Sequence, residues 1–240
     1  MTLIASFRCS DGGVLLCADR EQSQQFAKRS VDKIFELRCN QGMFLIAGAG
    51  RASIVDNTFA RLEIAVKTAD SNNVNLFDRH QDVIGTVLHE IHEEFIWGKH
   101  DEYARAIRLI IAASFASPHS IPFVYGTDEE ILYPQQLYGC AGVGQDLAYY
   151  FADKLYNEHL SGEGAVLLAA FIFREVSHSV AGVGLGTDMK FLAAKDSRRV
   201  RIPPNKVQEL ESGIPDIERA IADAWNGKII VPEWLTVLFT

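Results

Sequence analysis

Residues 2–19, TLIASFRCSDGGVLLCAD, contain two apolar runs on either side of the stretch SDGG. Aspartate and glycine between two such runs are typical of the tight turn that joins the strands of a β-hairpin. The first run begins at Leu3, immediately after Thr2. We therefore predict a β-rich start in which Thr2 lies at the beginning of the first strand.

Thr2 has the chemistry of a nucleophile if Met1 is removed. It then carries a hydroxyl and a free α-amine on one residue, a pairing in which the amine serves as the base for the hydroxyl. The ordinary pKa of an α-amine is about 7.7 to 8.0, so a usable fraction is unprotonated at neutral pH, whereas a lysine amine, at about 10.4, is almost fully charged. A threonine after Met1 is by itself only a small residue, so this assignment depends on residues further along the chain.

The rest of the chain alternates groups of strands with pairs of helices. Strand-like runs lie at residues 2–9, 13–19, 32–39, 42–49, 107–115, 121–126, 130–134, 136–142, 190–196 and 198–202. Apolar residues three or four positions apart predict helices within residues 54–66, 83–95, 147–155 and 165–176. This order predicts an α+β fold in which two sheets pack face to face with helix layers outside. We expect one domain over residues 1–202 and a C-terminal extension over residues 203–240, packed on the same domain and containing a short helix at 214–225.

The composition is that of an ordinary globular protein. The chain has 240 residues, of which 48% are hydrophobic and 22% charged, and its net charge of −8 argues against partners such as nucleic acid or an anionic membrane. We find neither a signal peptide nor a run of about 18 apolar residues, so we expect a cytoplasmic protein. The four cysteines form no C-x-x-C pair, which favours reduced core thiols over a disulfide framework or a zinc site.

Other motifs give no support for a metal or a cofactor. His89 and His92 are three residues apart on a predicted helix, unlike the spacing of four in H-E-x-x-H, and glutamates surround them. The glycine-rich stretches GAGRAS and GVGQD do not complete G-x-G-x-x-G, so we interpret them as tight turns. We therefore expect neither a metal nor a cofactor.

Three stretches together resemble a known family. TLIASFRCSDGGVLLCADR, VDKIFEL and FLIAGAGRAS are similar to the start of proteasome β subunits and of the bacterial HslV peptidase, which are N-terminal-threonine hydrolases. The resemblance implies a four-layer αββα sandwich of the N-terminal-nucleophile hydrolase type. Matched position by position, it implies that Thr2 is the nucleophile, Asp19 the acidic residue, Lys33 the catalytic lysine and Gly48 the glycine whose backbone N–H faces the oxyanion.

These implied roles have physical reasons. A charged Lys33 beside Thr2 would disfavour protonation of the α-amine and ease loss of the hydroxyl proton, and Asp19 could hold that charge in place. Gly48 has no Cβ, so a substrate carbonyl could approach its N–H closely, and one such donor is typically worth about 3 to 4 kcal/mol of the barrier.

The second half of the implied site departs from the family. Val143 stands where the family has a supporting serine, and Ser177, His178 or Ser179 fall near the place of a supporting aspartate. Fold is therefore better supported than activity.

The resemblance implies a threonine-type peptidase that acts on peptides or unfolded protein chains through an acyl-enzyme and needs no cofactor. It also implies a homo-oligomeric ring or similar assembly, served by a partner ATPase. Two alternatives stay open: a non-proteolytic amidase of the same fold, and a catalytically inactive subunit that only assembles.

Overall fold

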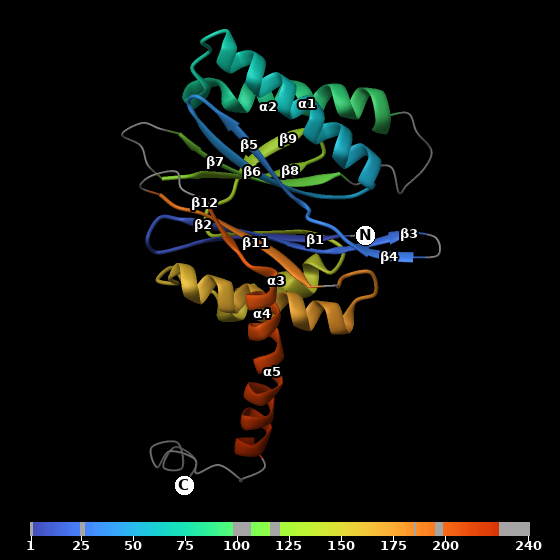
Figure 1. Ribbon diagram of the computed structural model, residues 1–240, viewed down its shortest axis with the longest axis vertical. Helices are drawn as coiled ribbons and strands as arrows, with labels where there is room; N and C mark the ends of the chain where they lie inside the picture. The colour runs from blue at the N-terminus through green and yellow to red at the C-terminus, as the bar shows by residue number, and fades with distance from the viewer. Residues whose placement is uncertain are drawn as a thin grey trace.

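The computed structural model describes residues 2–24, 27–97, 107–115, 121–184, 186–194 and 199–225. Met1, at the N-terminus, and residues 226–240 of the expected C-terminal extension lie outside this described part. Figure 1 shows two packed sheets with a pair of helices on each outer side, so the molecule has four layers.

The first sheet carries the N-terminus. Its order is β10-β1-β2-β11-β12 and all neighbours are antiparallel. Its strands are β1 (Leu3–Arg8), β2 (Val14–Asp19), β10 (Tyr138–Gly142), β11 (Thr187–Leu192) and β12 (Arg199–Ile202). β1 lies between β2 and β10, with Ala5 opposite both Cys17 and Cys140. The start of the chain therefore lies inside the sheet, and β1 and β2 form the hairpin that the sequence predicted.

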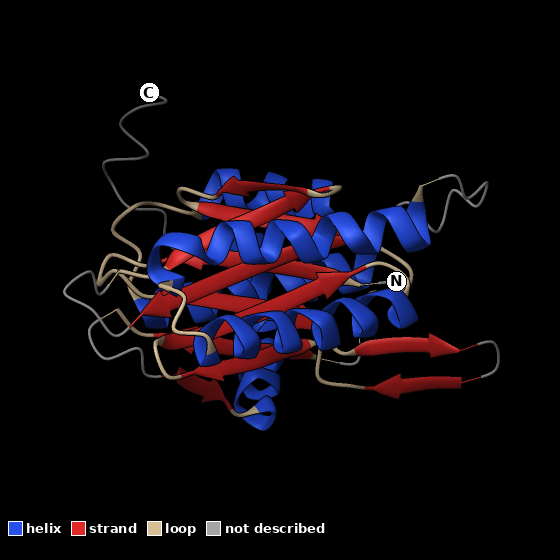
Figure 2. Ribbon diagram, turned by 90° about the horizontal axis from the view of Figure 1, so that it is seen from above, coloured by secondary structure: helices blue, strands red, loops and turns tan. Residues whose placement is uncertain are grey.

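The second sheet is also antiparallel, in the order β5-β6-β7-β8-β9. Its strands are β5 (Ile34–Cys39), β6 (Gly42–Ala49), β7 (Arg108–Phe115), β8 (Phe123–Asp128) and β9 (Ile131–Pro134). A separate two-stranded ribbon, β3 (Glu21–Gln24) and β4 (Ala27–Ser30), connects the sheets and projects from one side of the body (Figure 2). The sequence did not predict this ribbon, because its residues show no apolar alternation.

Two pairs of helices form the outer layers. They are α1 (Ala52–Ser71) and α2 (Leu76–Ile91), which continues as the π-helical turn η1 (His92–Ile96), and α3 (Gln145–Leu155) and α4 (Gly162–Ser179). Side-chain oxygens of Asn75 and Ser161 accept hydrogen bonds from Phe77 N and Gly164 N and so cap the starts of α2 and α4.

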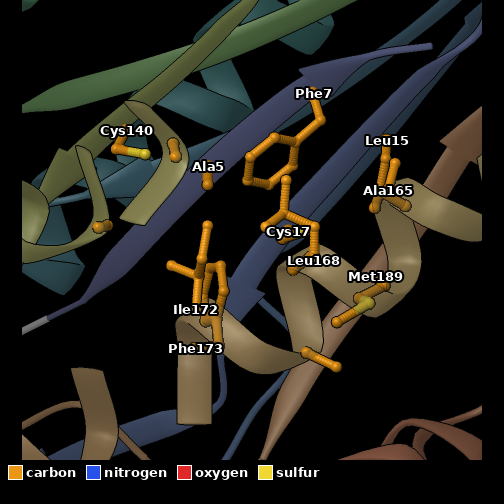
Figure 3. Close-up of a cluster of buried hydrophobic side chains, with 14 of the residues drawn as sticks. Ala5, Phe7, Leu15, Cys17, Cys140, Ala165, Leu168, Ile172, Phe173 and Met189 are labelled. Carbon is orange, nitrogen blue, oxygen red and sulfur yellow. The ribbon is translucent and has the colours of Figure 1, made fainter. Parts of the chain in front are cut away.

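Alternation along the strands divides the core into three parts. Phe44, Ile46 and their neighbours face α1 and α2, whereas Ile4, Leu16 and Leu45 meet between the sheets. Figure 3 shows the third part, in which Phe7, Cys17 and Met189 of the first sheet face residues of α4 such as Leu168 and Phe173. The buried faces match the apolar positions that predicted these elements.

The last helix differs from the expectation. α5 spans Pro204–Trp225 and runs through Pro215, whereas a short helix from residue 214 was expected. Pro204 occupies its first turn, where a missing N–H has no cost. Val207 and Ile214 are buried, and the helix extends away from the α3–α4 layer (Figure 1). None of the helices in the described residues combines the length and apolar character needed to cross a membrane.

Candidate active site

Thr2 lies directly before β1 and is nearly buried, with 8% of its surface exposed. Its hydroxyl Oγ1 accepts a hydrogen bond from Lys33 Nζ at 3.0 Å, and its backbone oxygen accepts one from Val143 N at 2.9 Å. The residue is therefore fixed at both its side chain and its backbone, and a lysine ammonium touches its hydroxyl.

Lys33 directly precedes β5, and its ammonium group reaches back to the first sheet. Besides Thr2 Oγ1, Nζ donates to both carboxylate oxygens of Asp19 at 3.1 Å and to the backbone oxygen of Glu21. The side chain is only 11% exposed. Thr2, Asp19 and Lys33, which the sequence analysis selected from positions up to 31 residues apart, thus form one hydrogen-bonded cluster.

Asp19 holds this cluster together from the end of β2. Its carboxylate accepts hydrogen bonds from Leu3 N at 2.8 Å and from Glu21 N at 3.1 Å, in addition to those from Lys33. The side chain is 1% exposed. A buried carboxylate is tolerated where such donors compensate for lost water, so Asp19 ties the residue after Thr2 to the ammonium group.

Burial dominates the electrostatics of this pair. It lowers the pKa of Lys33 below its ordinary value, and the charge and hydrogen bonds of Asp19 oppose that change. Burial also raises the pKa of Asp19, and Lys33 and the backbone N–H groups of Leu3 and Glu21 oppose it. The ammonium of Lys33 is therefore closer to losing its proton near neutral pH than that of a surface lysine.

Gly48 lies in β6 opposite Leu109. A Cβ at this position would come within 2.6 Å of Val55 Cγ1 and 3.0 Å of Phe59 Cζ, so the side of Gly48 that lacks a side chain faces α1. This close approach of helix and strand explains the glycine by packing. The role of its N–H at an oxyanion stays a prediction.

Gly142 and Val143 are site residues that the sequence analysis did not select for their backbone. Gly142 has φ +95°, and a Cβ on it would lie 1.9 Å from Thr2 O and 2.8 Å from Ala49 Cβ. The ends of β10 and β6 therefore both come close to Thr2. Val143 lacks the hydroxyl of the family serine, but its N–H holds the Thr2 carbonyl. Gly142 and Gly144 were the sequence signal for these residues, since two glycines so close together mark a tight turn.

A pocket of about 260 Å³ lies beside Asp19, between α4, α5 and the start of β11. Ser177 and His178 of the last turn of α4 line it together with Glu211 of α5, so two of the three candidates for the place of the family aspartate share this pocket with Asp19. Arg20 N donates to Gly184 O and Gly186 O and holds the adjacent loop against the end of β2.

His89, His92, Cys9 and Cys140 have structural surroundings. His92 is buried with Nδ1 2.8 Å from Leu88 O, and His89 Nδ1 contacts Glu130 at 2.6 Å. Burial raises the pKa of Cys9 and of Cys140 to about 12, which disfavours their thiolates. Within the described residues, no group of three or more histidine, cysteine, aspartate or glutamate side chains is arranged to hold a metal ion.

No family model and no curated protein sequence matches this chain. Solved structures do match. Anbu, described as an ancestral beta-subunit, from Yersinia bercovieri gives a TM-score of 0.75 at 12% identity, covering 91% of this chain and 95% of that one. Anbu from Hyphomicrobium sp. strain MC1 gives 0.73 at 15% identity over 92% and 97%. The helical assembly of the Anbu complex from Pseudomonas aeruginosa gives 0.73 at 11% identity over 96% and 98%.

These likenesses at low sequence identity establish the fold. The chain has a proteasome-β-like four-layer αββα sandwich of the N-terminal-nucleophile hydrolase type, as the resemblance implied.

Proposed function

We propose that this chain is an N-terminal threonine hydrolase that cuts peptide bonds through an acyl-enzyme on Thr2. The observation that carries the proposal is the contact of 3.0 Å between Lys33 Nζ and Thr2 Oγ1, made by an ammonium group that the buried carboxylate of Asp19 holds in place. A lysine in this position stabilises the alkoxide that forms as the hydroxyl loses its proton.

The reaction requires a free α-amine on Thr2, and hence removal of Met1. The hydroxyl proton passes to that amine while Oγ1 attacks the peptide carbonyl carbon, and a C–O bond forms. The C–N bond then breaks, and the leaving amine takes the proton. Water, deprotonated by the same α-amine, next attacks the ester carbonyl; the C–O bond to Thr2 breaks, and the carboxylic acid and the original hydroxyl are restored. A backbone N–H at Gly48 would stabilise the oxyanion in both halves.

Enclosure in a homo-oligomer fits this function, because an open peptidase would attack other proteins. The structure from Pseudomonas aeruginosa is a helical assembly of an Anbu complex, which supports self-assembly of this chain as part of the proposal. We infer peptides or unfolded chains as substrates and a separate ATPase as their supplier.

A non-catalytic assembly subunit is the second candidate. Val143 offers only its backbone N–H beside Thr2, so the hydroxyl that a serine would add near the α-amine is missing. A chain without turnover that still assembles would fit this observation.

The test combines intact mass with a threonine-directed covalent probe, such as a peptide β-lactone. Wild-type protein should lack Met1 and gain one probe mass on the N-terminal peptide, because Thr2 is the nucleophile. Thr2→Ala should gain none, and Thr2→Ser should react more slowly because it keeps both hydroxyl and amine. Thr58→Ala is a matched control, since Thr58 is a buried threonine whose hydroxyl donates only within α1. A probe on Thr2→Ala, or none on wild type with a free Thr2, would refute the peptidase.

A further inference from the structure

The hairpin of β11 and β12 sends positive side chains across to β5 in the other sheet. Lys190, which is 5% exposed, donates from Nζ to Ile34 O at 2.6 Å and lies 2.8 Å from Glu36 Oε1. Arg199 binds the same glutamate oxygen. Residues 34 and 36 point to the same side because side chains alternate along a strand. These contacts fix the beginning of β5 against the first sheet.

Asp32 receives a second set of contacts, from two arginines. Arg201 Nη2 lies 2.6 Å from Asp32 Oδ2, and Arg20 Nη2 lies 3.1 Å from Asp32 Oδ1. Behind Arg201, the carboxylate of Asp188 is fully buried, with Oδ1 3.7 Å from Arg201 Nε. Asp32 is therefore held from β12 and from the residue that follows β2.

Lys33 lies between these two anchored positions. The ion pairs of the Asp32 carboxylate and the hydrogen bond to the backbone oxygen of Ile34 hold the residues on both sides of it, while its own Nζ crosses to Thr2 and Asp19. We propose that Arg20, Arg201 and Lys190 act as a clamp on residues 32 and 34 that positions the Lys33 ammonium on the Thr2 hydroxyl. The three are positioning residues, and their role in reactivity rests on the proposed function.

Such a clamp has a physical purpose. Ordering a lysine side chain costs up to about 2 kcal/mol of conformational entropy, and ordering the backbone of the residue adds a further cost. If neighbouring contacts already hold the backbone, the contacts of the Lys33 ammonium need to offset only the side-chain part. Displacement of a reacting group by about 1 Å can cost on the order of 10²-fold in rate. Single exposed ion pairs contribute little, but here two arginines share one carboxylate and a buried lysine adds a hydrogen bond to the backbone.

The experiment removes the shared anchor with Asp32→Asn, a substitution of the same shape at a side chain that is 42% exposed. The matched control is Asp82→Asn, which breaks the exposed pair with Arg79 at 2.7 Å on α2. Asp32→Glu restores the charge, and Arg201→Gln is the second variant if Asp32→Asn does not fold. Two readouts are taken: the rate constant of Thr2 modification by the β-lactone probe, and the pKa of Lys33 from NMR of ¹³C-labelled lysine.

We expect Asp32→Asn to slow modification at least about tenfold with probe affinity unchanged, because Nζ is no longer held on the hydroxyl. The pKa of Lys33 should rise toward its ordinary value as the ammonium leaves its buried place. Asp32→Glu should recover part of both changes, and Asp82→Asn should change neither.

The two proposals fail in different ways. If wild type is not modified but the pKa of Lys33 rises in Asp32→Asn and not in Asp82→Asn, the clamp stands and the hydrolase proposal falls. If wild type is modified and Asp32→Asn matches it in rate and in Lys33 pKa, the clamp is wrong. A slower reaction without a change in that pKa, or one that Asp32→Glu does not improve, also overturns the clamp.

Discussion

Lys33 is the residue on which the proposed chemistry depends most, because one ammonium group contacts Thr2, Asp19 and the Glu21 carbonyl. Lys33→Ala removes all three contacts and should lower the rate of Thr2 modification about 10²- to 10⁴-fold. Lys33→Arg keeps the charge but places a planar guanidinium in a space shaped for an ammonium, so it should recover little. Modification rates followed by intact mass check this, with Lys67→Ala, at an exposed pair with Glu63, as the control. Equal rates for Lys33→Ala and wild type would contradict the assignment.

Asp19 should control the pKa of that lysine. Its negative charge raises the pKa of Lys33, against the lowering by burial. Asp19→Asn removes the charge and leaves burial, so the ammonium becomes less stable and its pKa should fall further. Modification of Thr2 should then have its pH dependence displaced to lower pH, with a lower maximum rate because the lysine is no longer held. NMR of labelled lysine measures the pKa directly, and a rise in Asp19→Asn would show that this carboxylate does not stabilise the charge.

At the scale of elements, the turn after β10 holds Thr2 in place. Gly142→Ala puts a methyl group at a position with φ +95° and only 1.9 Å from Thr2 O, so the Val143 N–H contact with Thr2 O must break. We expect a loss of about 1 to 3 kcal/mol in unfolding free energy and loss of Thr2 modification. Gly186→Ala is the matched control, because φ is +86° there but, among the described residues other than its chain neighbours, no atom lies within 4 Å of an added Cβ. Denaturant unfolding and probe labelling together measure both effects; equal behaviour of the two variants would assign the loss to backbone strain alone.

α2 contains a buried base that should make stability depend on pH. His80 Nδ1 lies 2.9 Å from Leu76 O and Nε2 lies 3.0 Å from the Tyr125 hydroxyl, and burial lowers the pKa of the ring. The unfolded chain, with a histidine pKa of about 6.5, then binds more protons than the folded one, so unfolding free energy falls as pH drops below that value.

Urea unfolding between about pH 7 and pH 5 should show this decline in wild type and a weaker one in His80→Gln. His89→Gln is the control with the opposite sign, because Glu130 raises the pKa of His89 at an exposed position. An unchanged slope in His80→Gln would show that another group causes the acid sensitivity.

The sequence predicted the elements whose signals are local. Thr2, Asp19 and Lys33 were selected through the resemblance to proteasome β subunits, whose pattern falls on consecutive strands within the first 39 residues of this chain. The sequence alone could not predict contacts between distant segments. The hydrogen bond from Val143 N to Thr2 O, for example, depends on the pairing of β1 with β10. The ribbon of β3 and β4 was missed because a two-stranded arm outside the core needs no apolar pattern. The extent of α5 was missed because Pro215 suggested an interruption that the helix does not make.

At the scale of the whole molecule, exposed apolar residues on the α3–α4 helix layer support self-assembly. Tyr150 on α3 and Leu167 on α4 are 57% and 55% exposed, and Leu155 at the end of α3 is 49% exposed. These three apolar side chains belong to the same helix layer, and contact with a neighbouring copy would remove their surface from water. We therefore expect light scattering to give a mass that is a multiple of 26.7 kDa, through contacts that include the α3–α4 layer.

Leu167→Glu tests this expectation, because a carboxylate buried in an interface would lose its hydration without a partner. The variant should scatter as smaller species, while its unfolding free energy changes little, since the side chain is already exposed in the single chain. Ile64→Glu, at a 66% exposed residue of α1 in the opposite helix layer, is the matched control and should keep the wild-type mass. If Ile64→Glu dissociates the protein and Leu167→Glu does not, the contact lies on the α1–α2 layer. If the wild-type protein has a mass of 26.7 kDa by light scattering over a wide concentration range, the self-assembly proposal is wrong. The proposal that neighbouring copies enclose the site would then be wrong as well.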